Sequence, residues 1–154
     1  MLSRVVIVCV GNICRSPMAE ALWRARIGSG GAGGVVESAG IAALVGAEAD
    51  PKAAALVRHR DLDISSHRAR QLSQDMVQRA SLVIVMEAEQ QRWIESQWPE
   101  ARGRVQALGR WGGFEVPDPY RGGDDDFRVA FDLIERGIED WNARLGGAPA
   151  TERQ

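Results

Sequence analysis

The stretch that decides the fold is VVIVCVGNICRSP, at residues 5–17. Its first part, residues 5–9, is a continuous apolar and largely β-branched run, typical of a strand buried on both faces of a parallel sheet. The run stops at Gly11-Asn12, and Ser16-Pro17 then predicts a helix start, with Ser16 as N-cap and Pro17 at the first helical position. A buried strand that leads through a short loop into a helix is the opening unit of a wound α/β sheet.

The rest of the chain continues this alternation of strands and helices. We expect further strands at residues 35–40, 82–86 and 105–108, and helices at 17–27, 50–57, 73–78, around 93–94 and at 127–145. With right-handed crossovers this order predicts an α/β fold, a doubly wound, flavodoxin-like sheet of four parallel strands with helices on both faces. Ligands bind such sheets at the carboxyl ends of the strands, which places the predicted site at Cys9.

Length and composition restrict the possible functions. The 154 residues suit a single domain over 1–154, with a disordered tail at about 146–154. A formal net charge of -2 favours neither nucleic acid nor an anionic membrane as a partner. No apolar run approaches the ~20 residues of a membrane span and no signal peptide is evident, so we expect a cytoplasmic protein without membrane insertion. Nothing in the composition indicates the oligomeric state.

The chain has two cysteines, Cys9 and Cys14, and two histidines, His59 and His67. Two cysteines are too few for a disulfide scaffold, and the spacing of the four residues fits no zinc motif. We therefore expect no metal site.

The loop from Cys9 to Ser16 has the composition of an oxyanion site. A loop at a helix N-terminus presents free amides and the positive end of the helix dipole. Gly11 and Asn12 tolerate the positive φ that a tightly curled loop needs, and the planar fork of Arg15 matches two phosphate oxygens. The same field stabilises a thiolate at Cys9, to which Ser16 can donate a hydrogen bond. The loop is neither a Walker loop nor a dinucleotide fingerprint.

A thiolate that attacks a phosphate ester needs an acid to protonate the leaving oxygen. Asp118 is the best candidate, because Pro117 and Pro119 stiffen the loop that carries it. The same three residues also suit an ordinary turn, and Tyr120 either walls a pocket or covers the loop. A single cysteine at a strand end is usually a small buried apolar residue, so the argument depends on the whole pattern.

These residues resemble the low-molecular-weight protein-tyrosine phosphatases. The matching stretches are Cys9–Ser16, Pro17-Met18-Ala19-Glu20, Ser38-Ala39-Gly40, His67-Arg68-Ala69-Arg70-Gln71 and Asp118-Pro119-Tyr120. The likeness is strongest to the bacterial branch that accompanies tyrosine kinases of capsule and exopolysaccharide export, through Ala43-Leu44-Val45-Gly46 and Pro117-Asp118-Pro119-Tyr120-Arg121.

The resemblance implies a role for each matching residue. Cys9 is the nucleophile and becomes a phosphocysteine, Arg15 holds the phosphoryl group, and Asp118 is first general acid and then general base. Substrate-binding positions are Val10, Gly11, Asn12, Ile13, Cys14 and Ser16 in the loop, with Leu44 and Tyr120 as walls of the slot for a flat ring. Ser38 and His67 belong to a supporting network. The implied substrate is a phosphotyrosine protein, and by analogy an autophosphorylated bacterial tyrosine kinase. The resemblance implies no metal and no organic cofactor.

Three other functions are open to such a loop. A thioredoxin-coupled arsenate reductase needs further cysteines, and none follows Cys14. A phosphoarginine phosphatase of the same family resembles the chain but carries Thr where Ile13 stands, and the apolar Ile13 suits a phenyl ring better. A phosphate-binding module needs neither Cys9 nor Asp118. His67, taken by itself, also fits a buried structural histidine.

The spacing of Cys9 and Cys14 on one curled loop also predicts a redox response. A stabilised thiolate is the thiol most easily oxidised. If the loop wraps around one phosphate, the two Cα atoms approach the ~4.4–6.8 Å that a disulfide requires. We therefore predict a reversible Cys9–Cys14 disulfide that protects Cys9.

Overall fold

The computed structural model describes residues 2–28 and 34–147. Its four strands are all parallel and lie in the order β2-β1-β3-β4. They are β1 Arg4–Cys9, β2 Val35–Gly40, β3 Leu82–Val85 and β4 Val105–Ala107. The helices are α1 Arg15–Arg26, α2 Pro51–Arg58, α3 Gln74–Arg79, α4 Ala88–Gln97, α5 Asp124–Arg144 and a short 3-10 helix at Pro99–Ala101. The predicted doubly wound sheet is confirmed.

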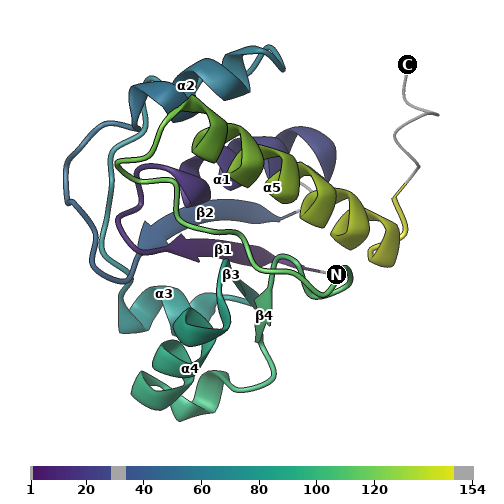
Figure 1. Cartoon of the computed structure of the whole chain (residues 1–154). Coiled ribbons are helices and arrows are strands. Elements are labelled where there is room, and N and C mark those ends of the chain that lie inside the picture. The colour runs from purple at the N-terminus through teal and green to yellow at the C-terminus, as the bar shows by residue number, and fades with distance from the viewer. Residues whose placement is uncertain (1, 29–33, 148–154) are drawn as a thin grey trace.

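The sheet lies between two layers of helices, with α1, α2 and α5 on one face and α3 and α4 on the other (Figure 1). Alternate residues of β1 pack against the two helix layers. Val5, Ile7 and Cys9 join the core under α1 and α5, whereas Val6 and Val8 join the core under α3 and α4. Burial on both faces explains why the strand is apolar at every position. Among the described residues, no helix is both long and apolar enough to cross a membrane.

The start of α1 differs from its prediction. The helix begins at Arg15 with Cys14 as N-cap, and no side chain caps it. Ser16 and Pro17 therefore lie inside the first turn, and the predicted N-cap role of Ser16 is wrong. The Ser16 hydroxyl contacts the Cys9 sulfur instead, at 2.9 Å.

Two glycines follow the C-terminal end of α5, which lies close to its predicted position. Gly146 and Gly147 were expected in a disordered tail, but their amides donate to the carbonyls of Ala143 and Asn142 at 3.2 and 2.8 Å and close the helix. Gly146 has φ 84°, the left-handed conformation common after a helix C-terminus. The rest of the predicted tail, residues 148–154, lies outside the described residues.

The carboxyl ends of β1 and β2 approach each other closely at Gly40. A Cβ atom there would collide with the Val10 carbonyl oxygen, so the position requires glycine. The absence of a side chain allows the segment after β2 to run beside the loop after β1.

Candidate active site

Residues 10–14 form the loop between β1 and α1, and the predicted site runs from Cys9, the last residue of β1, to Ser16 in the first turn of α1. Asn12 takes the left-handed conformation with φ 60°, as the sequence predicted, whereas Gly11 does not use a positive φ. A single left-handed residue is therefore enough to curl the loop. Asn12 and Ser16 are fully buried beneath it.

The sulfur of Cys9, at the end of β1, is 2.9 Å from the Ser16 hydroxyl oxygen. That oxygen accepts a hydrogen bond from the Asn12 amide at 2.7 Å. Because Ser16 already accepts from Asn12, its own hydrogen is available to the sulfur. A hydroxyl hydrogen directed at the sulfur and the positive N-terminal end of α1 therefore both lie on the side of the site that Cys9 occupies.

The Asn12 side chain is fixed by partners on all its polar atoms. Its amide nitrogen donates to Ser38 Oγ at 3.0 Å, and its amide oxygen accepts from the Arg70 backbone N–H at 2.9 Å. His67 Nε2 donates to the Asn12 carbonyl at 2.7 Å. The structure thus brings Ser38 and His67 to the loop from the far side, where they hold its shape without entering the site.

Arg15 is almost fully buried, at 1% exposure, beneath the site. Its Nη1 donates to Glu87 Oε1 at 2.7 Å and to the Val116 carbonyl at 2.8 Å. These two bonds occupy one edge of the guanidinium and leave Nε and Nη2 for a bidentate pair with two phosphoryl oxygens.

Glu87 is a residue that the sequence analysis missed. It lies two residues after the end of β3 at Val85, and β3 pairs with β1 in the sheet, so both carboxyl ends meet at one edge. The buried Gln90 holds the turn there, because its side-chain oxygen accepts from the backbone amides of Met86 and Glu87. A polar residue shortly after a buried strand was the only sequence signal for Glu87. To predict from it that Glu87 belongs to the site, one also had to know that β3 lies next to β1.

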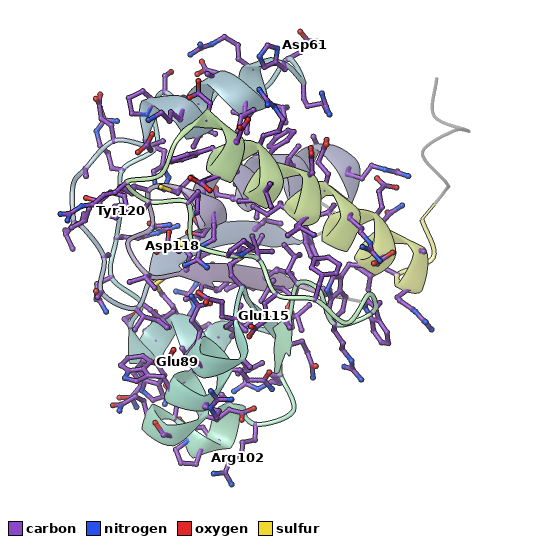
Figure 2. All side chains as sticks on the ribbon, viewed as in Figure 1. Asp61, Glu89, Arg102, Glu115, Asp118 and Tyr120 are labelled. Carbon is purple, nitrogen blue, oxygen red and sulfur yellow. The ribbon has the colours of Figure 1, made fainter. Side chains whose placement is uncertain are left out.

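Asp118 reaches the same site from the loop before α5. Its Oδ2 is 3.7 Å from Arg15 Nη2, and its Oδ1 accepts from the Tyr120 amide at 3.0 Å. Figure 2 shows Asp118 and Tyr120 together at the edge of the sheet where the strands end. The Asp118 carboxyl is 44% exposed, which gives it access to solvent water.

These side chains surround a cavity of about 170 Å³. Its lining comes from the loop after β1, from the segment after β2 and from the loop before α5, and consists of Cys9, Val10, Gly11, Ile13, Cys14, Arg15, Ala42, Leu44, Asp118 and Tyr120. Asn12, Ser16, Ser38 and His67 lie outside the lining. A larger cavity of about 410 Å³ between α1 and α5 contains none of the predicted site residues. Within residues 2–28 and 34–147, no cluster of three or more potential metal-ligating side chains is found.

Cys14 differs chemically from Cys9, although both are free thiols. Burial raises the pKa of the Cys14 thiol to about 12, and the negative charges of Asp50 and Cys9 add to the shift. Cys14 is therefore a neutral thiol at pH 7. Oxidation of Cys9 to a neutral sulfenic acid removes one of the charges that hold Cys14 protonated.

This difference gives the redox prediction a pH dependence. After peroxide forms the Cys9 sulfenic acid, the Cys14 thiolate attacks its sulfur, the sulfur–sulfur bond forms, the sulfur–oxygen bond breaks, and the leaving hydroxide takes a proton from solvent to become water. Since only the thiolate attacks, closure is expected to accelerate about tenfold per pH unit above pH 7. Intact mass should fall by two hydrogens relative to the reduced protein, and dithiothreitol should restore activity. In the matched variant Cys14→Ser no disulfide can form, so excess peroxide should oxidise the Cys9 sulfenic acid to the sulfinic acid, which dithiothreitol does not reduce, and activity should not recover. Equal recovery of both proteins contradicts the prediction.

The fold and the site define a class of protein: a doubly wound α/β domain in which a cysteine, an arginine and an aspartate line one cavity at the carboxyl ends of the strands. The family model for low molecular weight phosphotyrosine protein phosphatases matches residues 4–149. One curated relative is the probable low molecular weight protein-tyrosine-phosphatase EpsP of Ralstonia nicotianae, 43% identical over 145 residues that cover 94% of this chain and 97% of that protein.

Two solved structures extend the likeness to three dimensions. Wzb of Vibrio vulnificus in complex with benzylphosphonate has a TM-score of 0.86 and 33% identity, with 93% of this chain and 99% of that chain covered. The YwlE arginine phosphatase of Geobacillus stearothermophilus has a TM-score of 0.84 and 30% identity, with 94% and 93% covered. The chain belongs to the low molecular weight phosphotyrosine protein phosphatase family.

Proposed function

We propose that the chain hydrolyses phosphotyrosine in proteins through a phosphocysteine intermediate at Cys9. One observation carries the proposal: Cys9, Arg15 and Asp118 line the same cavity, although Asp118 is more than a hundred residues away in sequence. A nucleophile, an oxyanion fork and an acid at one site are the groups that phosphoryl transfer to a thiol requires.

In the first step the Cys9 thiolate attacks phosphorus, a sulfur–phosphorus bond forms, and the bond to the tyrosyl oxygen breaks. Arg15 and the loop amides stabilise the charge on the three phosphoryl oxygens. Asp118 gives its proton to the leaving phenolate, which departs as neutral tyrosine.

In the second step water attacks the phosphocysteine and inorganic phosphate leaves. Asp118, now a carboxylate, accepts the proton from that water, as reversibility requires. The Cys9 thiolate is the leaving group, and the hydrogen bond from Ser16 stabilises it again. The enzyme returns to its starting state, with Asp118 protonated for the next cycle.

The apolar part of the cavity supports an aromatic substrate. Ile13, Ala42, Leu44 and the ring of Tyr120 form its walls next to the thiolate. A flat phenyl ring buries apolar surface against these side chains, whereas a charged guanidinium would have to give up water there.

The experiment that tests the substrate class compares peptides that carry phosphotyrosine or phosphoarginine. We expect the wild-type chain to prefer phosphotyrosine in kcat/KM. Ile13→Thr should shift the ratio toward phosphoarginine by about tenfold, because the wall becomes polar. The matched variant Ile13→Val keeps an apolar wall and should keep the ratio. A wild-type preference for phosphoarginine would overturn the assignment.

The physiological partner in this proposal is an autophosphorylated bacterial tyrosine kinase of exopolysaccharide export. The names EpsP and Wzb among the relatives support this choice. A cytoplasmic location belongs to the same proposal, because phosphotyrosine is made where kinases have access to ATP.

A further inference from the structure

Exposed apolar side chains gather at the mouth of the site. Seven large apolar side chains of the described residues are exposed, and four of them belong to the site or its rim: Val10, Leu44, Val45 and Tyr120. Val45 is the most exposed of the seven, at 71%. Such grouping marks an interaction surface, whereas single exposed apolar residues need no explanation.

Val45 is held at the corner of a rigid turn. The Ala47 amide donates to the Leu44 carbonyl at 2.9 Å, and Gly46 has φ 85°, which corresponds to a type II turn with Val45 at its second position. The Gly46 amide also donates to the Ala69 carbonyl at 2.9 Å.

The segment that carries this turn is also joined to the loop after β1. Three backbone amides donate to carbonyls of that loop: Ala42 to Val10, Leu44 to Gly11 and Asp50 to Ile13, at 3.0, 3.1 and 2.8 Å. The turn is therefore fixed relative to the cavity, and Val45 remains exposed although its backbone is held in place.

Arg121 brings a positive charge to the mouth from the other segment, the loop before α5. Its backbone has φ 65°, a conformation that costs a non-glycine residue free energy and is concentrated at functional sites. Its guanidinium lies 5.3 Å from the centre of the Tyr120 ring. Among the described residues, no carboxylate lies within ion-pairing distance of Arg121.

Two carboxylates on the segments that carry Val45 and Arg121 pair with other arginines. Glu48 pairs with Arg68 at 3.5 Å, and Asp118 faces Arg15 at 3.7 Å. An acidic group on a bound substrate would therefore find Arg121 without displacing an existing partner.

We propose that the side chains around the opening of the cavity recognise the residues that flank the phosphotyrosine. A large apolar side chain on one side of the phosphotyrosine packs against the Val45 turn. An acidic side chain on the other side pairs with Arg121. The substrate class is thus a phosphotyrosine segment with one apolar and one acidic neighbour. This inference rests on the proposed function, since it assumes that a phosphotyrosine occupies the cavity.

The test uses the whole chain and a set of short phosphotyrosine peptides. Each peptide carries Leu or Ser on one side of the phosphotyrosine and Glu or Gln on the other, and the set is made in both orders. For every protein, kcat/KM for a peptide is divided by the value of the same protein for p-nitrophenyl phosphate. This normalisation separates flanking recognition from the chemistry at Cys9.

In one of the two orders, wild type should prefer Leu over Ser by about three- to tenfold. In that order it should also prefer Glu over Gln by about two- to fivefold, and 0.5 M salt should remove this second preference. Val45→Ser should abolish the first preference alone. Arg121→Asn should abolish the second alone, and asparagine also tolerates the positive φ.

Matched controls come from exposed residues elsewhere. Val129→Ser removes a 51% exposed valine on α5, and Arg102→Asn removes an exposed arginine far from the site in Figure 2. Both should leave both ratios at wild-type values. Equal ratios for all peptides, or preferences that survive Val45→Ser and Arg121→Asn, overturn the inference. Lack of activity on p-nitrophenyl phosphate and on every phosphotyrosine peptide overturns the proposed function instead.

Discussion

Cys9→Ser is expected to lower the turnover of p-nitrophenyl phosphate by at least about 10³-fold, because a serine hydroxyl at this position is not ionised at neutral pH. The oxygen is also smaller than sulfur and lies further from the phosphorus. The measurement is kcat from steady-state hydrolysis, with the release of inorganic phosphate as a second readout.

The Cys9→Ser protein should still bind phosphate, because Arg15 and the loop amides remain. Calorimetric titration with inorganic phosphate therefore separates loss of chemistry from loss of the site. Cys14→Ser is the matched control in the same loop and should retain most of the reduced enzyme's activity. Activity of Cys9→Ser within tenfold of wild type would mean that another group attacks the phosphorus.

Asp118→Ala is expected to lower kcat by about 10²–10⁴-fold on phenyl phosphates with poor leaving groups. On p-nitrophenyl phosphate the first step should suffer less, because a good leaving group departs without a proton. KM should not rise, since Arg15 and the loop amides, which bind the substrate dianion, are unchanged. Single-turnover measurements over a series of leaving groups isolate this step.

Glu89→Ala is the control for Asp118→Ala, because it removes another exposed carboxylate from the first turn of α4 (Figure 2). It should change neither kcat nor its dependence on the leaving group. Asp118→Asn keeps the size of the side chain and should behave like Asp118→Ala. An equal loss on good and poor leaving groups would assign Asp118 a structural role.

Local sequence patterns predicted the unit from β1 to α1 because its determinants lie within a dozen residues. The apolar run specifies a strand buried on both faces, and Asn12 adopts the left-handed conformation that its side chain tolerates. The error at Ser16 has a physical reason. Ser-Pro is a local signal for a helix start, but the tertiary contact with the Cys9 sulfur uses the hydroxyl that would have capped the helix.

The parts of the site that the sequence did not predict depend on distant pairs. Glu87 contacts Arg15 across 72 residues, and the Val116 carbonyl contacts it across 101. Neither contact leaves a periodic trace, because it depends on which strands are neighbours and how far one loop reaches. Asp118 was found through the two prolines beside it, while its distance from Arg15 required the structure.

Arg15 contacts both the loop that carries Asp118 and the site of the oxyanion, so it connects the position of that loop with oxyanion binding. Through Nη1 it holds the Val116 carbonyl, two residues before Asp118, and through its free edge it faces the site of the oxyanion. The position of the acid-bearing loop and the affinity for an oxyanion are therefore thermodynamically linked, and the coupling is reciprocal. An oxyanion that draws the guanidinium toward itself acts on the loop, and a substitution that displaces the loop acts on the oxyanion to the same extent in free energy. Kinetic effects measured at position 15 consequently contain both contributions, and only a double-mutant cycle with a loop residue separates them.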